Sequence, residues 1–217
     1  MDQKIYILKV YNHTLKVYTV LTENEKKVLR LLLTAIDIDY SINEIAKDCN
    51  LSPNGALKIL RKLEAEGVLE AKKIANIKSY KLNFENENTI NILILALVNK
   101  LKGRLKYRRE DFETLRQIVK ACIVFGSYTS LKKEPNDLDV LFILDKDKFK
   151  DYKRRLDDIK DTIPAKVHDI LQTEEDLVNN ILTKDKIVMN ILKNGIVLWG
   201  QKIIIEVVKD AHQRKTK

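Results

Sequence analysis

The sequence has few residues that cross-link, stiffen or break a chain. Its 217 residues include two cysteines, three prolines, six glycines and one tryptophan. Two cysteines cannot build a disulfide framework, and Cys49 and Cys122 each lie in an apolar segment. We therefore expect two buried free thiols and a reducing, cytoplasmic location. No stretch is rich in Gly, Pro or Ser, so the sequence predicts no freely flexible linker.

The sequence also lacks a long hydrophobic run. The longest apolar segment, from Ile90 to Val98, is interrupted by Asn91. It is much shorter than the roughly 20 residues that a helix needs to span a bilayer. The first residues, Met1 to Lys4, have none of the features of a signal peptide. We expect no membrane partner, and the length suits two domains of about 100 residues each.

Charge is plentiful and unbalanced. Forty Lys and Arg residues against 31 Asp and Glu give a formal net charge of +9 and a pI near 9.3. A basic surplus favours partners that carry phosphate, such as nucleic acid or nucleotides. Many Lys and Glu residues are also typical of proteins that use surface charge for stability at high temperature. The net charge alone therefore leaves both explanations open.

Three helices with clear start signals are predicted between residues 21 and 84. Two open with capping boxes, in which a hydroxyl and a carboxylate three residues apart satisfy free backbone N–H groups. These are Thr22 with Glu25, and Ser41 with Glu44. The third helix begins at Ser52 and ends before Gly67, a residue that tolerates a left-handed C-cap. Strands at 68–73 and 78–82 follow, so the order predicts a winged helix-turn-helix.

The second helix of such a motif, here Ser52 to Glu66, enters the major groove of DNA. Asn and Arg can contact base edges, and Lys neutralises phosphate, so double-stranded DNA is the expected partner. The predicted DNA-binding residues are Ser52, Asn54, Lys58, Arg61 and Lys62 on this helix, with Lys72, Lys73 and Lys78 on the hairpin. The stretch LSPNGALKILRKLEAEGVL, residues 51–69, resembles winged helix-turn-helix domains of archaeal and bacterial transcription regulators. Such domains also serve as protein-docking modules.

The most informative stretch is 122–144. An apolar strand leads into Gly126-Ser127, and nine residues later Asp137 and Asp139 open a second apolar strand. Residues two apart on a strand point to one face, so both carboxylates are expected on the same side. Two such close carboxylates would repel one another unless a cation lies between them, and Mg²⁺ prefers oxygen ligands of this kind. Taken alone, an Asp-x-Asp pair is often only the solvated start of a strand.

The combination of Phe125-Gly126-Ser127, this spacer and Asp137-Leu-Asp139-Val resembles the signature of the DNA polymerase beta superfamily, with its minimal nucleotidyltransferases the most similar members. The resemblance implies Mg²⁺-dependent transfer of a nucleoside monophosphate from a nucleoside triphosphate, ATP first, to a hydroxyl group. It implies that Gly126 and Ser127 bind the nucleotide, and that Asp137 and Asp139 are catalytic and bind the metal. Two departures are a spacer without glycine and an Asn before the Asp pair, where Ser is frequent.

Relatives of this kind usually add a third carboxylate from a neighbouring strand. The resemblance makes Asp169 the candidate third catalytic and metal-binding residue, with Glu174, Glu175 and Asp176 as the fallback. If Asp169 points away, the sequence alone gives less support for catalysis. The three histidines are scattered, and we expect them to be structural or solvated.

Together these patterns predict an α/β (α+β) protein. We expect a winged helix-turn-helix with N-terminal strands over 1–84, a helical connector over 85–104, and a nucleotidyltransferase domain with a mixed sheet and flanking helices over 105–217. The alternative is a transcription regulator whose second domain only senses nucleotide or dimerises, including an antitoxin-type autoregulator. A homodimer is expected because winged helices usually bind two half-sites, and because the apolar face of residues 90–101 needs cover. A protein is one candidate acceptor.

Overall fold

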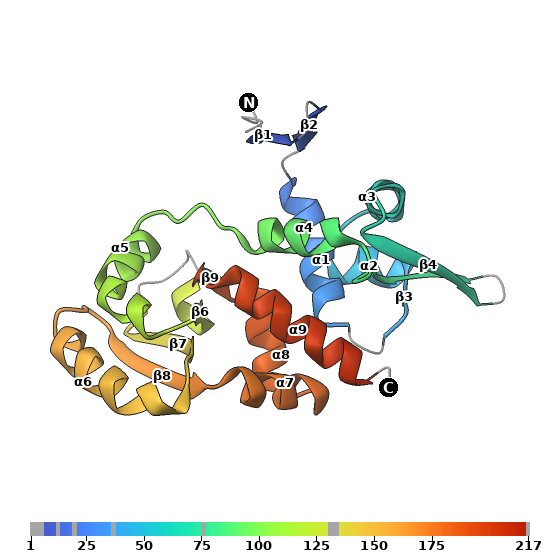
Figure 1. Ribbon diagram of the computed structural model, residues 1–217. Coiled ribbons are helices and arrows are strands. Elements are labelled where there is room, and N and C mark those ends of the chain that lie inside the picture. The colour runs from blue at the N-terminus through green and yellow to red at the C-terminus, as the bar shows by residue number, and fades with distance from the viewer. Residues whose placement is uncertain are drawn as a thin grey trace.

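The computed structural model describes residues 7–11, 14–18, 21–35, 38–74, 77–129 and 135–215. Its N-terminal half carries a two-stranded hairpin, then helices and a small antiparallel sheet of order β3-β5-β4 (Figure 1). The elements are β1 (Ile7–Tyr11), β2 (Thr14–Tyr18), α1 (Glu23–Leu33), β3 (Tyr40–Ser41), α2 (Ile42–Asp48), α3 (Pro53–Ala65), β4 (Leu69–Ile74) and β5 (Ile77–Leu82). The turn between β4 and β5 lies outside the described residues. This order is that of a winged helix-turn-helix, with β4 and β5 as the wing.

The capping signals start the helices where the sequence predicts. The Thr22 and Ser41 side chains accept hydrogen bonds from the backbone N–H groups of Glu25 and Glu44, and both capping boxes are complete. The Ser52 hydroxyl accepts from the N–H of Gly55 at 3.1 Å. Each bond satisfies a backbone donor that the first turn of a helix leaves free. These local bonds fix where each helix of the winged domain begins.

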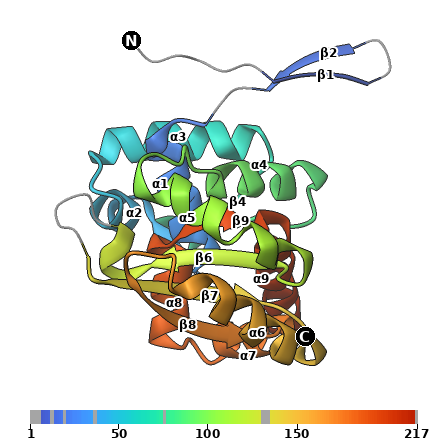
Figure 2. The ribbon, with the colours of Figure 1, turned by 90° about the vertical axis from the view of Figure 1, so that its left-hand side faces the viewer.

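The C-terminal half is a four-stranded sheet with helices on both faces (Figure 2). Its strand order is β8-β7-β6-β9; β7 and β8 are parallel, and the other two pairs are antiparallel. The strands are β6 (Ala121–Phe125), β7 (Asp137–Ile143), β8 (Lys166–Gln172) and β9 (Ile196–Trp199). The helices are α6 (Phe149–Lys160), α7 (Glu174–Leu182), α8 (Lys186–Asn194) and α9 (Gln201–Lys215), with 3-10 turns η2 (Gly126–Thr129) and η3 (Lys146–Lys148).

Between the two halves lie α4 (Glu87–Leu97), α5 (Arg104–Asp111) and the 3-10 turn η1 (Glu113–Gln117). Helix α4 packs against α1 and α9, so it contacts both halves of the molecule. Its residues Leu93, Ala96 and Leu97 are each no more than 1% exposed. Most of the apolar face that was expected to need a dimer partner is therefore covered within the chain, although Val98 is 44% exposed.

Two hydrophobic clusters hold the structure together. Leu138, Val140 and Phe142 of β7 face one cluster, which includes Phe112 and Tyr152. The opposite face of the sheet, through Leu141 and other residues, shares a single cluster with the winged helix and helices α7 to α9. A continuous core of this kind joins the halves by apolar packing and not by a flexible tether. Within the described ranges, no helix is long and apolar enough to cross a membrane.

Candidate nucleotide site and nucleic-acid interface

Asp137 and Asp139 begin β7 with both side chains on one face of the sheet. The residues between and after them, Leu138 and Val140, are fully buried on the other face. The Asp137 side chain is 52% exposed and that of Asp139 is 29% exposed. The alternation of a strand therefore places two accessible carboxylates together at the sheet edge where β7 starts.

Gly126 brings the turn after β6 directly against Asp139. Phe125, the last residue of β6, is paired with Asp139 in the antiparallel register. Gly126 has φ +67°, and a Cβ atom on it would lie 2.2 Å from Asp139 Oδ2. Only glycine accepts both this backbone conformation and this approach without displacing the carboxylate. Gly126 and the following Ser127 are exposed, in the turn that lies against Asp139.

The structure corrects the expected position of Asp169. In the parallel register of β7 and β8, Asp169 is opposite Val140, and His168 is opposite Asp139. Asp169 therefore lies on the face of Val140, away from the carboxylate pair. Its Oδ2 accepts a hydrogen bond of 3.1 Å from the hydroxyl of buried Tyr152 on α6. The predicted third carboxylate is an exposed partner of the Tyr152 hydroxyl, and the structure does not bring it to Asp137 and Asp139.

His168 occupies the position that was expected for a carboxylate. Its Nδ1 lies 3.6 Å from Asp139 Oδ1, and its Nε2 lies 4.0 Å from Asp137 Oδ1. Sequence reasoning missed this histidine because it treated all three histidines as scattered. Neighbouring residues of a strand point to opposite faces, so either His168 or Asp169 had to face Asp137 and Asp139. A shift of β8 by one residue against β7 would exchange the two.

The fallback acids have other partners. Asp176 accepts hydrogen bonds from the N–H and hydroxyl of Thr173 and so caps α7. Hydrogen bonds from the backbone and then from the side chain of Thr173 lower the pKa of Asp176. Glu174 pairs with Lys120 at 2.7 Å, and Glu175 pairs with Arg214. These residues act in helix capping and surface ion pairs.

Two carboxylates are too few to bind Mg²⁺ alone, but they can bind Mg²⁺ that is already coordinated by phosphate. Among the residues described, no group of three or more His, Cys, Asp or Glu side chains could hold a metal ion. Mg²⁺ in nucleotide sites is commonly held by one or two carboxylates together with phosphate oxygens and water. Asp137 and Asp139, beside the Gly126 turn, are two carboxylates of this kind.

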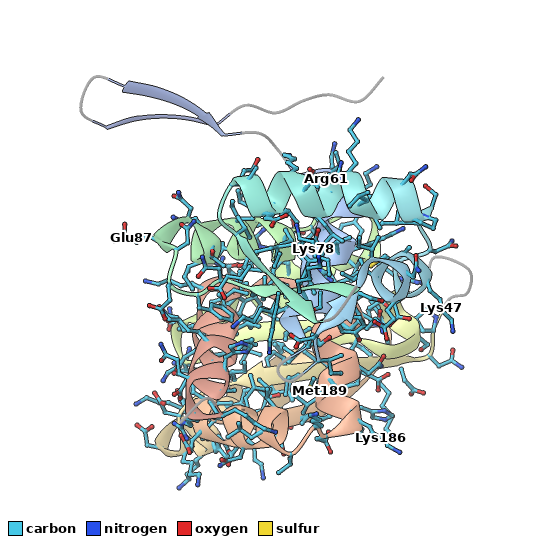
Figure 3. All side chains as sticks on the ribbon, turned by 90° about the vertical axis from the view of Figure 1, so that its right-hand side faces the viewer. Lys47, Arg61, Lys78, Glu87, Lys186 and Met189 are labelled. Carbon is cyan, nitrogen blue, oxygen red and sulfur yellow. The ribbon has the colours of Figure 1, made fainter. Side chains whose placement is uncertain are left out.

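Helix α3 presents its polar face to solvent along the side of the molecule that Figure 3 shows, with Arg61 pointing outward. Asn54, Lys58 and Arg61 are exposed, and within the described part of the chain their side chains have no hydrogen bond or ion pair. Ser52 caps the helix. Three of the predicted contacts are therefore free to meet a ligand, and each lies about one helical turn from the next.

Two predicted DNA contacts have structural partners. The Lys62 ammonium donates to Glu25 Oε1 at 2.6 Å, and Glu25 is buried at the start of α1. Lys78 pairs with Glu64 at 2.8 Å and lies over the ring of Tyr80. The structure thus gives Lys62 a role in joining α3 to α1, and Lys78 a role in holding the wing against α3. Lys72 and Lys73 are exposed on β4 and keep their place on the wing.

Comparison with protein families gives two matches. Residues 111–203 match the family model for polymerase beta nucleotidyltransferases, and residues 21–70 match the model for winged helix-turn-helix DNA-binding domains. Neither a search of curated proteins nor a search of solved structures gave a match. The chain therefore joins a winged helix-turn-helix DNA-binding domain to a polymerase beta nucleotidyltransferase domain. Nucleotidyltransferases of this family generally use Mg²⁺ and nucleoside triphosphates.

Proposed function

We propose that this protein binds double-stranded DNA through α3 and the wing, and binds a Mg²⁺-nucleoside triphosphate, ATP first, at the start of β7. The observation that carries the nucleotide site is the contact of Gly126 with Asp139, which a single Cβ atom would abolish. This contact supports a site in which backbone N–H groups of the turn and the Asp139 carboxylate would meet one ligand. Phosphate accepts from such donors, and when bound Mg²⁺ would offset the charge on the phosphates.

The chain's own residues divide the work. Gly126 lets the backbone approach the phosphates, and Ser127 offers them its N–H and hydroxyl. Asp137 and Asp139 would hold the metal from one side. On the winged domain, Arg61 and Asn54 would contact base edges, and Lys58, Lys72 and Lys73 would neutralise backbone phosphate. This proposal no longer counts Lys62 and Lys78 among the DNA contacts, because they pair with Glu25 and Glu64.

Equilibrium binding of fluorescent ATP to the full chain tests the nucleotide part. Binding is expected in Mg²⁺, with a large loss in EDTA and in Asp139→Asn. Fluorescence anisotropy with a mixed-sequence duplex tests the DNA part, with affinity that falls steeply as salt rises. Equal ATP binding with and without Mg²⁺ would contradict the nucleotide site, and salt-independent duplex binding would contradict the interface.

A second candidate function is nucleotidyl transfer to a hydroxyl group, with a protein as one acceptor. In this reaction the acceptor oxygen bonds to the α-phosphorus as the bond to the bridging oxygen of the β-phosphate breaks. Pyrophosphate leaves, and the acceptor proton passes to water. The observation that favours transfer is His168, whose imidazole lies beside both carboxylates at the position expected for a third acid. Asp169 lies on the other face of the sheet, so Asp137 and Asp139 lack a third carboxylate from it. This arrangement favours nucleotide sensing by a transcription regulator.

Transfer and sensing separate in one experiment. ATP labelled in its α-phosphate is incubated with the protein and cell extract, with wild type against Asp139→Ala. A labelled acceptor formed only by wild type supports transfer and identifies the acceptor class. If both proteins leave the extract unlabelled while wild type binds ATP, the protein is a nucleotide-sensing regulator.

Sedimentation with a palindromic duplex would show the proposed homodimer as two chains on one site.

A further inference from the structure

A polar pocket separate from the β7 site lies between the winged helix and α8. Its volume is about 410 Å³. The residues that matter for binding are Lys26, Lys27 and Arg30 of α1, Asn50 after α2, Asn99, and Lys193 of α8. We propose that this pocket binds a phosphorylated small molecule of nucleoside monophosphate size, and that the bound ligand joins the two domains.

The charge of the lining favours an anion. Two acids, Glu23 and Asp48, also line the pocket, and Glu23 neutralises Lys26 at 3.0 Å. Lys27 and Lys193 come from different domains, and neither side chain has a hydrogen bond or ion pair with another described residue. Both ammonium groups are therefore available to a ligand that enters between the domains.

The Cys49 thiol, which also lines the pocket, is influenced by the charges around it. Burial raises the pKa of the Cys49 thiol, and the charges of Lys193 and Lys27 act in the opposite direction. A charge influences a thiol in this way only from nearby, because the effect weakens with distance. Asp48, which also lines the pocket, raises this pKa further, and Lys27, Cys49 and Lys193 all line the same pocket.

Arg30 adds a fixed cation at the back of this region. Its Nη1 donates to the carbonyl of Gly195 at 2.9 Å, and its Nε donates to the carbonyl of Ala96 at 3.2 Å. Two bonds hold the guanidinium in place, so little side-chain entropy remains to be lost on binding. Its Nη2 is buried and has no hydrogen-bond partner among the described residues, so a phosphate that reached it would satisfy a donor that is otherwise unpaired.

Size and the remaining walls indicate more than a bare phosphate ion. The volume lies within the range of about 300–1,000 Å³ that is usual for small-molecule sites. Asn50 and Asn99 add amide groups, and the Oδ1 of Asn99 stays available because only its Nδ2 is used, by the carbonyl of Leu97. Amide groups of this kind suit the sugar hydroxyls and base edges of a nucleotide.

The pocket borders the strand that leads to the β7 site. Strand β9 pairs antiparallel with β6, with Val124 opposite Ile196. Asn194 and Gly195, which precede β9, therefore run alongside the end of β6 that continues into Gly126. A ligand held between Lys27 of the winged helix and Lys193 of α8 would connect the DNA-binding half to this edge of the sheet. Its binding is independent of Mg²⁺, because no carboxylate of the β7 site lines the pocket.

Calorimetric titration of AMP into the full chain in EDTA tests the proposal. AMP is expected to bind wild type and Asp139→Asn with equal affinity. The double variant Lys27→Gln, Lys193→Gln should bind roughly tenfold more weakly or worse, because it loses two charge-assisted bonds. The matched control is Lys47→Gln, Lys186→Gln, which removes the same charge from exposed lysines of α2 and α8 that do not line the pocket (Figure 3). This control should bind AMP as wild type does.

Three results would overturn the proposal: no AMP binding to wild type, an equal loss in both double variants, or inorganic phosphate binding as tightly as AMP. Circular dichroism melting of each variant checks that the fold is kept. The outcome is distinguishable from failure of the proposed function. Asp139→Asn reports on Mg²⁺-ATP binding at the β7 site, whereas the lysine variants report on AMP binding in EDTA.

Discussion

The winged helix and the nucleotidyltransferase sheet differ in how each positions its functional residues. In the winged helix, α3 presents Asn54, Lys58 and Arg61 by the periodicity of one helix, and the helix is started by its own Ser52 cap. In the sheet, the site depends on how three strands are paired. Asp137 and Asp139 share one strand, but the third residue depends on the register of β8 against β7. The spacing of residues within one helix or strand therefore determines which side chains share a face. The register between two strands determines which side chains lie next to each other.

The largest effect should come from Gly126, where the sheet site has no space for a side chain. Gly126→Ala would place a Cβ atom 2.2 Å from Asp139 Oδ2 at a residue with φ +67°. We expect more than a tenfold loss of Mg²⁺-ATP affinity, since either the turn or the carboxylate must move. Calorimetry measures the loss.

The matched control is Gly103→Ala, at φ +52° with nothing within 4 Å of the added atom. It introduces a comparable backbone strain away from the site. Equal ATP affinity of the two alanine variants would show that the contact between Gly126 and Asp139 does not position the site.

A second test compares neighbouring cations on α3. Arg61→Ala removes an exposed, unpaired side chain, and duplex affinity should fall by about tenfold with little change in stability. Lys62→Ala removes the partner of buried Glu25, so the free energy of unfolding should fall by about 1–2 kcal/mol. Anisotropy and urea denaturation give the two values. A fall in duplex affinity without a loss of stability in Lys62→Ala would return Lys62 to the DNA interface.

The third test addresses the hydrogen bond between Tyr152 and Asp169. Tyr152→Phe removes the hydroxyl that donates to Asp169 Oδ2 and should lower the free energy of unfolding by about 1 kcal/mol. Mg²⁺-ATP affinity should stay unchanged, because both residues lie on the face of the sheet away from Asp139. A marked change in ATP affinity without loss of stability would connect Asp169 to the nucleotide site.

The smallest effect concerns the pH dependence of the winged helix. Burial raises the pKa of Glu25, but hydrogen bonds from Lys62 and Thr22 outweigh it and leave the pKa below its ordinary value. A lowered folded pKa stabilises the protein above the unfolded pKa of about 4.3, and this contribution is lost as pH falls through the folded pKa. The unfolding free energy of wild type should therefore fall more steeply with acid than that of Glu25→Gln. Urea denaturation between about pH 6 and pH 3 measures both slopes, and identical slopes would contradict the assignment.

Much of the fold followed from local signals. The capping boxes at Thr22 and Ser41 and the Ser52 cap predicted the helix starts, because each is closed by bonds within four residues. The Gly126 turn and the shared face of Asp137 and Asp139 followed from strand alternation. The ion pair of Lys62 with Glu25 joins residues 37 positions apart, so helical periodicity could not predict it.

The exchange of Asp169 for His168 has the same origin. Val167, Asp169 and Leu171 lie on one face of β8, as the alternation of a strand requires. Which face that is depends on the pairing of Lys166 with Asp137, and nothing within β8 specifies this pairing. The apolar face of α4 likewise found its cover in α1 and α9, which no pattern within residues 90–101 could indicate.

Side-by-side calorimetric titration of Mg²⁺-ATP into wild type, Asp139→Asn and Asp169→Asn tests the nucleotide site most directly. Both substitutions remove one charge and keep the side-chain shape, and in Asp169→Asn the amide oxygen could still accept from the Tyr152 hydroxyl. The account predicts that Asp139→Asn loses most of the binding and that Asp169→Asn binds as wild type does. Loss of binding in Asp169→Asn, with binding retained in Asp139→Asn, would contradict it.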